Sequence, residues 1–301
     1  MPKTRSSRKN KTRKKNLARH SPRLLWPIIA LGITGAIVTL LYLIPLPMGI
    51  RPEIHPPFEE FDSAPKVSLP SKPSRPESTA LKPLVAILID DMGYNLPINN
   101  AFLELEVPLS FSFLPSAPYT PKLARKARDL GKDVLIHLPL EPVNSAIDPG
   151  PGALRLSMDL DSMLQMLRRD LDAVPDAIGV NNHMGSKFTT SQRGMELILA
   201  EIKRRGLFFV DSRTTRYTVA YATARSMGIP SAERTVFLDH DARKESIRKE
   251  VRKMVKVSVK NGYALAIGHP TINTWKVLHD ELPRVSKRLR IVPVHKILVA
   301  Q

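Results

Sequence analysis

The chain has 301 residues, of which 43% are hydrophobic, a length and composition typical of a protein with one large globular domain or two small ones. It contains no cysteine, which excludes disulfides, cysteine nucleophiles and thiolate metal sites, so any metal must be held by histidine and carboxylate side chains. The formal net charge is +18, but residues 1–23 alone hold ten Lys or Arg and no acidic residue. Because the rest of the chain is only mildly basic, we do not expect nucleic acid as a partner.

Residues 24–44 form an uncharged, apolar run of 21 residues, the length that a helix needs to cross a bilayer. The basic tail before this run predicts, by the positive-inside rule, that residues 1–23 are cytoplasmic. A cleavable signal peptide is the alternative, which the length of the run and the lack of a small-residue cleavage site disfavour. We therefore predict a single-pass anchor in the cell membrane, with the rest of the chain outside the cytoplasm and in the periplasm if the envelope is Gram-negative.

Residues 45–82 are rich in proline and poor in large apolar side chains, a composition typical of an extended linker. Residues 83–301 then form one domain in which short apolar runs alternate with segments of helical periodicity. The expected strands are residues 84–90, 109–114, 133–138, 177–182, 207–211, 235–238, 263–268 and 290–294. The expected helices include residues 119–130, 159–171, 192–205 and 242–260, with Gly131, Gly206 and Gly262 as C-caps.

This alternation predicts an α/β domain with a parallel sheet, either a closed β/α barrel or a doubly wound open sheet. Reactive polar residues follow most of the predicted strands, and in a barrel the C-terminal ends of parallel strands converge on one mouth. We therefore favour a β/α barrel of seven to eight parallel strands with a site at that mouth. The polar residues at strand ends are Asp90, Asp91, His137, Asn181, Asn182, His183, Asp211, Asp239, His240 and His269.

Asp90 and Asp91 end the first strand and are followed by Gly93, which suits a turn. Two adjacent carboxylates repel each other in a dry pocket, so one of them needs a cation while the other can keep a raised pKa that suits a general base. A role in turn formation or helix capping is the alternative, which their position at a strand end disfavours.

His137 and His183 end the third and fourth strands, each with a carboxylate or amides nearby in the sequence, as metal-bound imidazoles require. We predict that both histidines bind a metal ion. Asp211 is a candidate for holding a histidine in place, and His269 for donating a proton to a leaving amine. Asp239 and His240 are weaker candidates, for which capping of the following helix is an equal alternative. For Trp275 we expect packing rather than stacking on a sugar.

With these motifs in this order, residues 83–299 resemble the divergent polysaccharide deacetylase family, a branch of the carbohydrate deacetylases. The motifs are Ile-Asp-Asp-Met-Gly at 89–93, Phe-Ser-Phe-Leu-Pro at 111–115, His-Leu-Pro-Leu-Glu-Pro at 137–142, Asn-Asn-His-Met-Gly-Ser at 181–186, Val-Asp-Ser at 210–212 and Gly-His-Pro at 268–270. The resemblance implies a distorted β/α barrel and a divalent metal, with zinc expected, that polarises the acyl carbonyl and activates a water. It also implies Asp91 as a metal ligand, Asp90 as the base and His269 as the acid.

The sequence departs from the wider superfamily in two places. Typical members carry two histidines four residues apart after the third strand, where this chain has His137 and Glu141. Their Arg-x-Pro-Tyr signature after the fourth strand is replaced by residues 181–183. Either His183 or Glu141 would then complete the ligand set. The residues expected to contact the substrate are Asn181, Asn182 and Ser186.

The sequence thus predicts a membrane-anchored, metal-dependent hydrolase of the deacetylase type that acts on an acetylated envelope polysaccharide. The expected partners are this glycan and, through the N-terminal helix, the membrane. The alternative is a non-catalytic envelope protein that keeps the barrel as a scaffold or as a glycan-binding module, which the altered ligand set would favour.

Overall fold

The computed structural model describes residues 82–299. The predicted cytoplasmic tail, the predicted anchor and nearly all of the predicted linker lie outside this range, so the boundaries placed at residues 23, 44 and 82 stay predictions. Within the described range, none of the helices combines the length and the apolar composition that a transmembrane segment requires.

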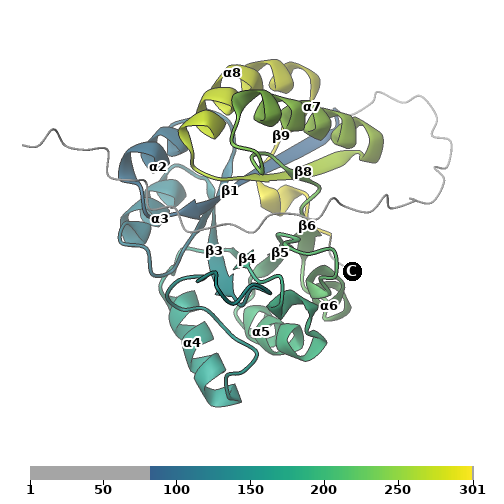
Figure 1. Ribbon diagram of the computed structural model, residues 1–301. Helices are drawn as coiled ribbons and strands as arrows, with labels where there is room; N and C mark the ends of the chain where they lie inside the picture. Colours follow the sequence, from purple (N-terminus) through teal and green to yellow (C-terminus); the bar gives the residue numbers. More distant parts are fainter. Residues whose placement is uncertain (1–81, 300–301) are drawn as a thin grey trace, which may run out of the picture. The chain divides into compact units, whose positions relative to one another are not determined.

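Strands and helices alternate along the described chain (Figure 1). The strands are β1 (Leu84–Met92), β2 (Ser110–Phe113), β3 (Asp133–Leu140), β4 (Gly179–Met184), β5 (Phe208–Asp211), β6 (Ser231–Glu233), β7 (Val236–Phe237), β8 (Tyr263–Gly268) and β9 (Arg290–Ile291). The α-helices are α2 (Leu96–Leu103), α3 (Thr120–Asp129), α4 (Leu160–Asp172), α5 (Gln192–Arg204), α6 (Ala220–Ser226), α7 (Lys244–Asn261) and α8 (Ile272–Arg288). Two short 3-10 helices are η1 (Phe188–Thr190) and η2 (Val294–Lys296).

The strands form one parallel sheet in the order β6-β5-β4-β3-β2-β1-β8-β7, and the short β9 pairs with the start of β1. This consecutive order is that of a β/α barrel, whereas the order reverses in a doubly wound sheet. The two end strands, β6 and β7, are not paired with each other in this sheet order, and the chain crosses between them through Arg234 and Thr235. The predicted α/β barrel is thus confirmed, with a distortion in the form of an open seam.

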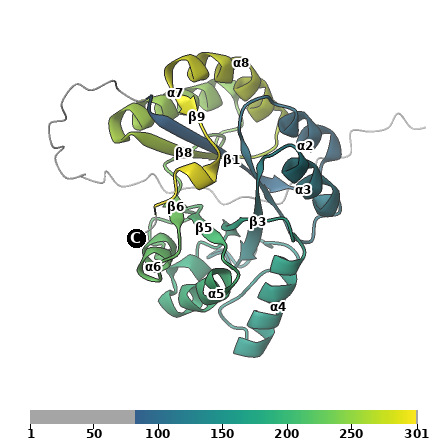
Figure 2. The ribbon, with the colours of Figure 1, turned by 180° about the vertical axis from the view of Figure 1, so that it is seen from behind.

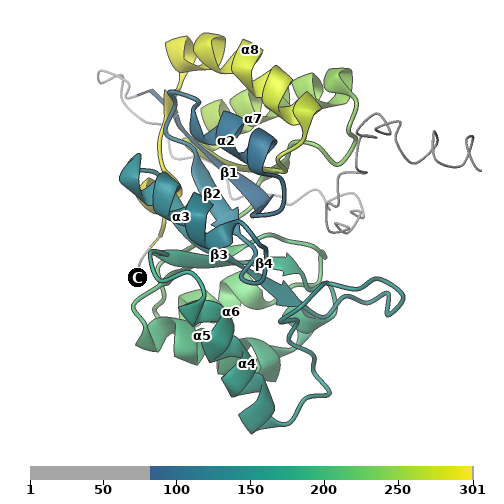
Figure 3. The ribbon, with the colours of Figure 1, turned by 90° about the vertical axis from the view of Figure 1, so that its left-hand side faces the viewer.

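Helices pack against the outside of the sheet in two groups that lie on opposite sides of the domain. Helices α7 and α8 lie along β1 and β8, while α4, α5 and α6 lie on the far side, next to β3, β4 and β5 (Figure 3). Side chains alternate between the two faces of each strand, so β1 sends Val85 and Ile87 to the core under the helices and Ala86 and Leu88 to the inner cluster. Because both faces of each strand are buried, the strands are continuous runs of apolar residues, and such runs can be recognised in the sequence.

The C-terminal segment fills the end of the barrel where the strands begin (Figure 2). Val292 and Val294 join the inner cluster, and the adjacent His295 donates its backbone N–H to Asp133 Oδ2 at 3.0 Å. Its ring nitrogen Nδ1 lies 2.7 Å from Asp133 Oδ1. The strand predicted at residues 290–294 is therefore only two residues long, because the chain turns after it into η2. This segment therefore does not occupy the opposite mouth of the barrel, where the strands end.

Three of the helices, α2, α6 and α8, and one strand, β6, were not among the elements whose bounds were given from the sequence. Helix α2 is only eight residues long and has Pro97 as its second residue, α6 has seven residues, and α8 contains Pro283 in its interior. Strand β6 has three residues. Short length and proline weaken the periodic signal, so these elements depend on tertiary packing. The predicted C-cap Gly262 does end α7, with a left-handed backbone.

Two glycines with nearly equal backbone angles provide a matched test of packing at the end of β4. Gly185 has φ +89° and a Cβ there would lie 2.8 Å from Leu140 Cβ, whereas Gly262 has φ +85° with nothing within 4 Å. We expect Gly262→Ala to lower the free energy of unfolding by about 1–2 kcal/mol, the cost of a left-handed alanine. Gly185→Ala should cost about 1–3 kcal/mol more because β3 and β4 must also move apart. Urea denaturation measures both, and equal losses would contradict this packing.

Candidate metal centre

The inward side chains of the strands change from apolar to polar as each strand reaches the mouth. On β1, Ala86 and Leu88 of the inner cluster are followed in the same alternation by Asp90. On β3, Leu135 is followed by His137. The same inward alternation gives Asn181 and His183 on β4, Ser212 after β5 and His269 after β8. One end of the barrel therefore collects acids, amides and imidazoles from strands that are distant in sequence.

Asp91 joins this group although strict alternation would turn it away. Its backbone is left-handed, with φ 54°, and the pairing register of β1 shifts between Ile89 and Met92. Aspartate tolerates this conformation better than most residues, at a cost of about 1–3 kcal/mol. The distortion lets two consecutive carboxylates, Asp90 and Asp91, serve the same site.

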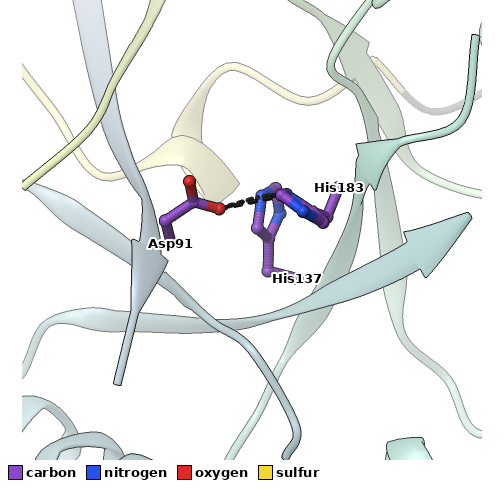
Figure 4. Close-up of side chains that lie close together, drawn as sticks. All are labelled: Asp91, His137 and His183. Carbon is purple, nitrogen blue, oxygen red and sulfur yellow. Dashed lines mark hydrogen bonds and ion pairs between the residues drawn. The ribbon is translucent and has the colours of Figure 1, made fainter. Parts of the chain in front are cut away.

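Three buried donor atoms converge on one point (Figure 4). Asp91 Oδ1 lies 3.1 Å from His137 Nε2 and 3.0 Å from His183 Nδ1. The two ring nitrogens are 3.2 Å apart. All three side chains are 2% exposed. The atoms thus form a nearly equilateral triangle that is closed to bulk solvent.

This triangle fits a divalent cation. An ion with four tetrahedral bonds of about 2.0–2.1 Å would separate its ligand atoms by about 3.3 Å, close to the distances observed. Although it lies near both histidines, Asp91 Oδ1 has no hydrogen bond of acceptable geometry within residues 82–299. A buried carboxylate oxygen without a donor is costly, and a bound cation would satisfy it.

Asn181 fixes the chemistry of its neighbours. Its Nδ2 donates to both oxygens of Asp90, at 2.9 and 3.0 Å, so its Oδ1 must be the acceptor that faces His137 Nδ1 at 3.0 Å. The proton of neutral His137 is thereby placed on Nδ1, and Nε2 presents its lone pair to the centre of the triangle. Ser112 Oγ also donates to Asn181 Oδ1.

The two adjacent aspartates have opposite pKa shifts. Burial raises the pKa of Asp90 to about 6, even though His137 and His269 oppose the shift. Burial acts on Asp91 as well, but His183 and His137 hold the pKa of Asp91 well below its ordinary value. Burial lowers the pKa of His183, which favours the neutral imidazole. The site thus combines one ionised carboxylate beside two imidazoles with a second carboxylate able to exchange a proton near neutral pH.

His269 is held by an aspartate of the neighbouring strand end. Asp239 Oδ1 lies 3.0 Å from His269 Nδ1, and Asp239 Oδ2 accepts the His269 backbone N–H at 2.7 Å and the Thr274 hydroxyl at 2.7 Å. Burial alone would lower the pKa of His269, but Asp239 raises it to about 9. His269 Nε2 points toward the triangle and lies 3.9 Å from Asp91 Oδ2.

Two sequence predictions are wrong. Glu141 does not join the triangle, because its Oε1 binds Lys187 Nζ and its Oε2 accepts the Leu156 backbone N–H, each at 2.8 Å. Asp211 holds no histidine; it lies on the outward alternation of β5 and accepts hydrogen bonds from the loop that follows it. The role expected of Asp211 belongs to Asp239, for which helix capping had been an equal alternative.

The predicted substrate contacts are engaged within the protein. Asn181 is fully buried against Asp90 and His137, and Asn182 Nδ2 donates to the Met184 carbonyl at 2.8 Å. The hydroxyl of Ser186 accepts the backbone N–H of Val143 at 2.9 Å. Asn182 still lines the pocket at the mouth, but Asn181 positions catalytic candidates and Ser186 binds a neighbouring loop.

The pocket above the triangle also contains residues that the sequence did not single out. Its volume is about 30 Å³, and Ser212, Thr214, Arg234 and Phe237 contribute to its wall. Arg234 lies at the open seam of the barrel, where no strand pattern draws attention to it. His240 is exposed outside this wall, and Trp275 packs by donating its indole N–H to the Ala101 carbonyl, as the packing prediction required.

The fold and the site define a parallel β/α barrel protein with a candidate Asp-His-His metal centre at the strand ends. The divergent polysaccharide deacetylase family matches residues 87–298, and the chain belongs to this family. The resemblance drawn from the sequence motifs is thereby confirmed.

The chain is also similar to several bacterial proteins. The chain is 34% identical over 221 residues to the uncharacterized protein YibQ of Escherichia coli, covering 73% of this chain and 69% of that protein. It is 35% identical over 208 residues to an uncharacterized protein of Haemophilus influenzae, covering 69% of this chain and 74% of that protein. The crystal structure of the uncharacterized protein ATU2773 from Agrobacterium tumefaciens has the same fold, with a TM-score of 0.69 and 22% identity over 74% of this chain and 92% of that chain.

The pairing of His269 with Asp239 predicts a pH effect in protein stripped of metal by a chelator. Asp239→Asn should lower the pKa of His269 from about 9, because the carboxylate that stabilises the imidazolium is lost. In the wild type the stabilisation from this pair should be complete below about pH 6.5 and lost as the pH rises through about 9. NMR titration of the ring measures the shift. Asp241→Asn is the control, because this half-buried carboxylate two residues further along the chain binds Arg243 and Ser246. An unchanged His269 pKa in Asp239→Asn would contradict the assignment.

Proposed function

We propose that the protein is a metal-dependent hydrolase of the deacetylase type that removes acetyl groups from an envelope polysaccharide. Asp91, His137 and His183 hold the divalent ion, with zinc expected from the nitrogen and oxygen donors. The observation that carries the proposal is the triangle of donor atoms, 3.0 to 3.2 Å on each side, next to a carboxylate whose pKa burial raises to about 6. Membership of the polysaccharide deacetylase family supports it.

Each neighbouring residue has a definite task in this reaction. The chemistry that the ion supplies when bound is polarisation of the acyl carbonyl and activation of a water. Asp90, ionised above pH 6, accepts the proton of the attacking water, and Asn181 holds its carboxylate in place. His269, kept protonated by Asp239, donates a proton to the departing group.

The size of the pocket supports a small acyl group as the part of the substrate that enters. A volume of about 30 Å³ holds about two water molecules, since one water needs roughly 10–15 Å³ by this measure. An acetyl group is of this scale, whereas a sugar ring is several times larger. In this proposal the acyl group reaches the triangle and the saccharide rests on the rim of the pocket.

The location of the protein belongs to the same proposal. The uncharged run of residues 24–44 and the ten basic residues before it support an anchor in the cell membrane, with the barrel outside the cytoplasm. In a Gram-negative envelope this places the barrel in the periplasm. The proline-rich residues 45–82 would give the barrel reach toward a polymer fixed in the envelope.

Metal binding can be tested apart from catalysis. We expect Asp91→Ala and His183→Ala to weaken zinc binding by at least about 100-fold, because each removes one of three protein ligands. Glu141→Gln is the matched control and should bind zinc like the wild type, since its carboxylate is engaged by Lys187 and Leu156. Competition titration with a zinc chelator measures the affinities. Zinc retained by both alanine variants would contradict the site.

Catalysis is tested with the zinc-loaded protein and acetylated glycans. Asp90→Asn should retain zinc but release acetate about 100-fold to 10,000-fold more slowly, because a carboxamide cannot accept the proton. Asp170→Asn is the control, since Asp170 is a buried carboxylate whose pKa burial also raises to about 6 but which lies on α4, away from the mouth.

Acetate is assayed with peptidoglycan fragments and chitooligosaccharides. If the zinc-loaded wild type releases none from these or from other envelope glycans, the hydrolase proposal fails and the non-catalytic scaffold is favoured.

A further inference from the structure

The loop between β5 and α6, residues 212–219, is fixed in place by a buried carboxylate that the proposed reaction does not use. Asp211, with no exposed surface, accepts hydrogen bonds from the Arg213 backbone N–H at 2.8 Å and from the Thr218 hydroxyl at 2.9 Å. It also accepts the backbone N–H of Tyr221 at 3.2 Å. Both ends of the loop are thus tied to one side chain.

A side chain from the open seam and a backbone carbonyl of β4 also bind this loop. Arg234 donates through Nε to the Ser212 carbonyl at 2.6 Å and through Nη2 to the Arg213 carbonyl at 2.9 Å. The Thr214 hydroxyl donates to the Met184 carbonyl at 2.9 Å. Such a dense set of bonds leaves the loop little freedom, which is unusual for a surface connection.

The loop also stores backbone strain. Arg213 has φ 50°, and the other residues besides glycine with positive φ in the described chain are Asp91 and Met184. All three lie at strand ends on the mouth. Left-handed backbone at such residues costs about 1–3 kcal/mol each and gathers at functional sites, where the surrounding structure enforces it.

The tip of this rigid loop presents an aromatic ring and a cation to solvent. Tyr217 is 62% exposed, and the Arg216 guanidinium lies 4.7 Å from the centre of its ring. Only Tyr119 and Tyr217 are aromatic among the exposed large apolar side chains of residues 82–299. A tyrosine and an arginine held rigidly on an exposed loop are the residue types that dominate binding energy at recognition surfaces.

The loop that carries this pair also forms part of the pocket wall, which indicates what the pair binds. Ser212 and Thr214 of this loop line the pocket, and Arg216 and Tyr217 come two and three residues after Thr214 in the chain. In the proposed reaction the acyl group enters the pocket, so the sugar rings of the substrate lie outside it. We infer that Arg216 and Tyr217 form a saccharide subsite, in which Tyr217 contacts a sugar ring and Arg216 a carboxylate of the glycan. This inference rests on the proposed function for the class of ligand.

Binding measurements on the full-length protein in detergent test the subsite without requiring turnover. The probes are soluble peptidoglycan fragments, which carry carboxylates, and the neutral N-acetylchitopentaose. We expect Tyr217→Ala to raise the Kd for both probes by about 5-fold to 10-fold, and Arg216→Ala to raise the Kd for the carboxylate-bearing fragments alone. Val259→Ala, an exposed apolar residue on α7, is the control and should match the wild type.

A wild-type Kd for both probes in Tyr217→Ala, or no binding of either probe by the wild type, would overturn the subsite. Asp211→Ala provides a second readout: faster hydrogen exchange at the Arg213 and Tyr221 amides together with a raised Kd would mark Asp211 as a positioning residue. Glycan binding that depends on Tyr217, without any acetate release, would overturn the proposed hydrolase activity but would still support the saccharide subsite. Acetate release by the wild type, together with an unchanged Kd for both probes in Tyr217→Ala, would overturn the subsite but not the hydrolase activity.

Discussion

The mouth of the barrel depends on the approach of three lone-pair donors, Asp91 Oδ1, His137 Nε2 and His183 Nδ1, to within 3.0 to 3.2 Å of one another in a buried space. Lone pairs at this separation repel unless a proton or a cation lies between them. The surrounding structure enforces the approach: a bulged, left-handed β1 turns Asp91 inward, and on the paired strands β3 and β4 His183 lies one inward-facing position beyond Asn181, the register partner of His137. The candidate metal centre is therefore a consequence of the barrel itself.

The two adjacent aspartates show how the environment divides roles between identical side chains. Both are buried, but Asp91 faces two imidazoles while Asp90 is held by the neutral amide of Asn181. At Asp90, burial outweighs the opposing effect of His137, His269 and the Asn181 hydrogen bond, and raises its pKa to about 6. Asn181 thus orients the carboxylate of Asp90 and the imidazole of His137 together.

Alternation along the strands explains which site predictions held and which did not. The strands and the polar residues at their ends could be read from the sequence because parallel strands buried on both faces are continuous apolar runs. Facing direction could not be read at the ends, where bulges and irregular turns break the period of two. Asp211 was predicted to partner a histidine although the regular alternation of β5 turns it toward the helices, and Asp239 was undervalued although it binds His269. Arg234 escaped notice because it lies in the seam between two very short strands.

The sequence by itself determined the α/β class of the fold, most of its strands and the chemical character of the site, because hydrophobic periodicity and amino-acid composition can be read directly from the chain. It left open whether His183 or Glu141 accompanies Asp91 and His137. Only the tertiary structure decided this choice, since it depends on which side chains β3, β4 and their loops bring within about 3 Å. Glu141 is drawn to Lys187 and the Leu156 amide, and His183 is left to complete the triangle.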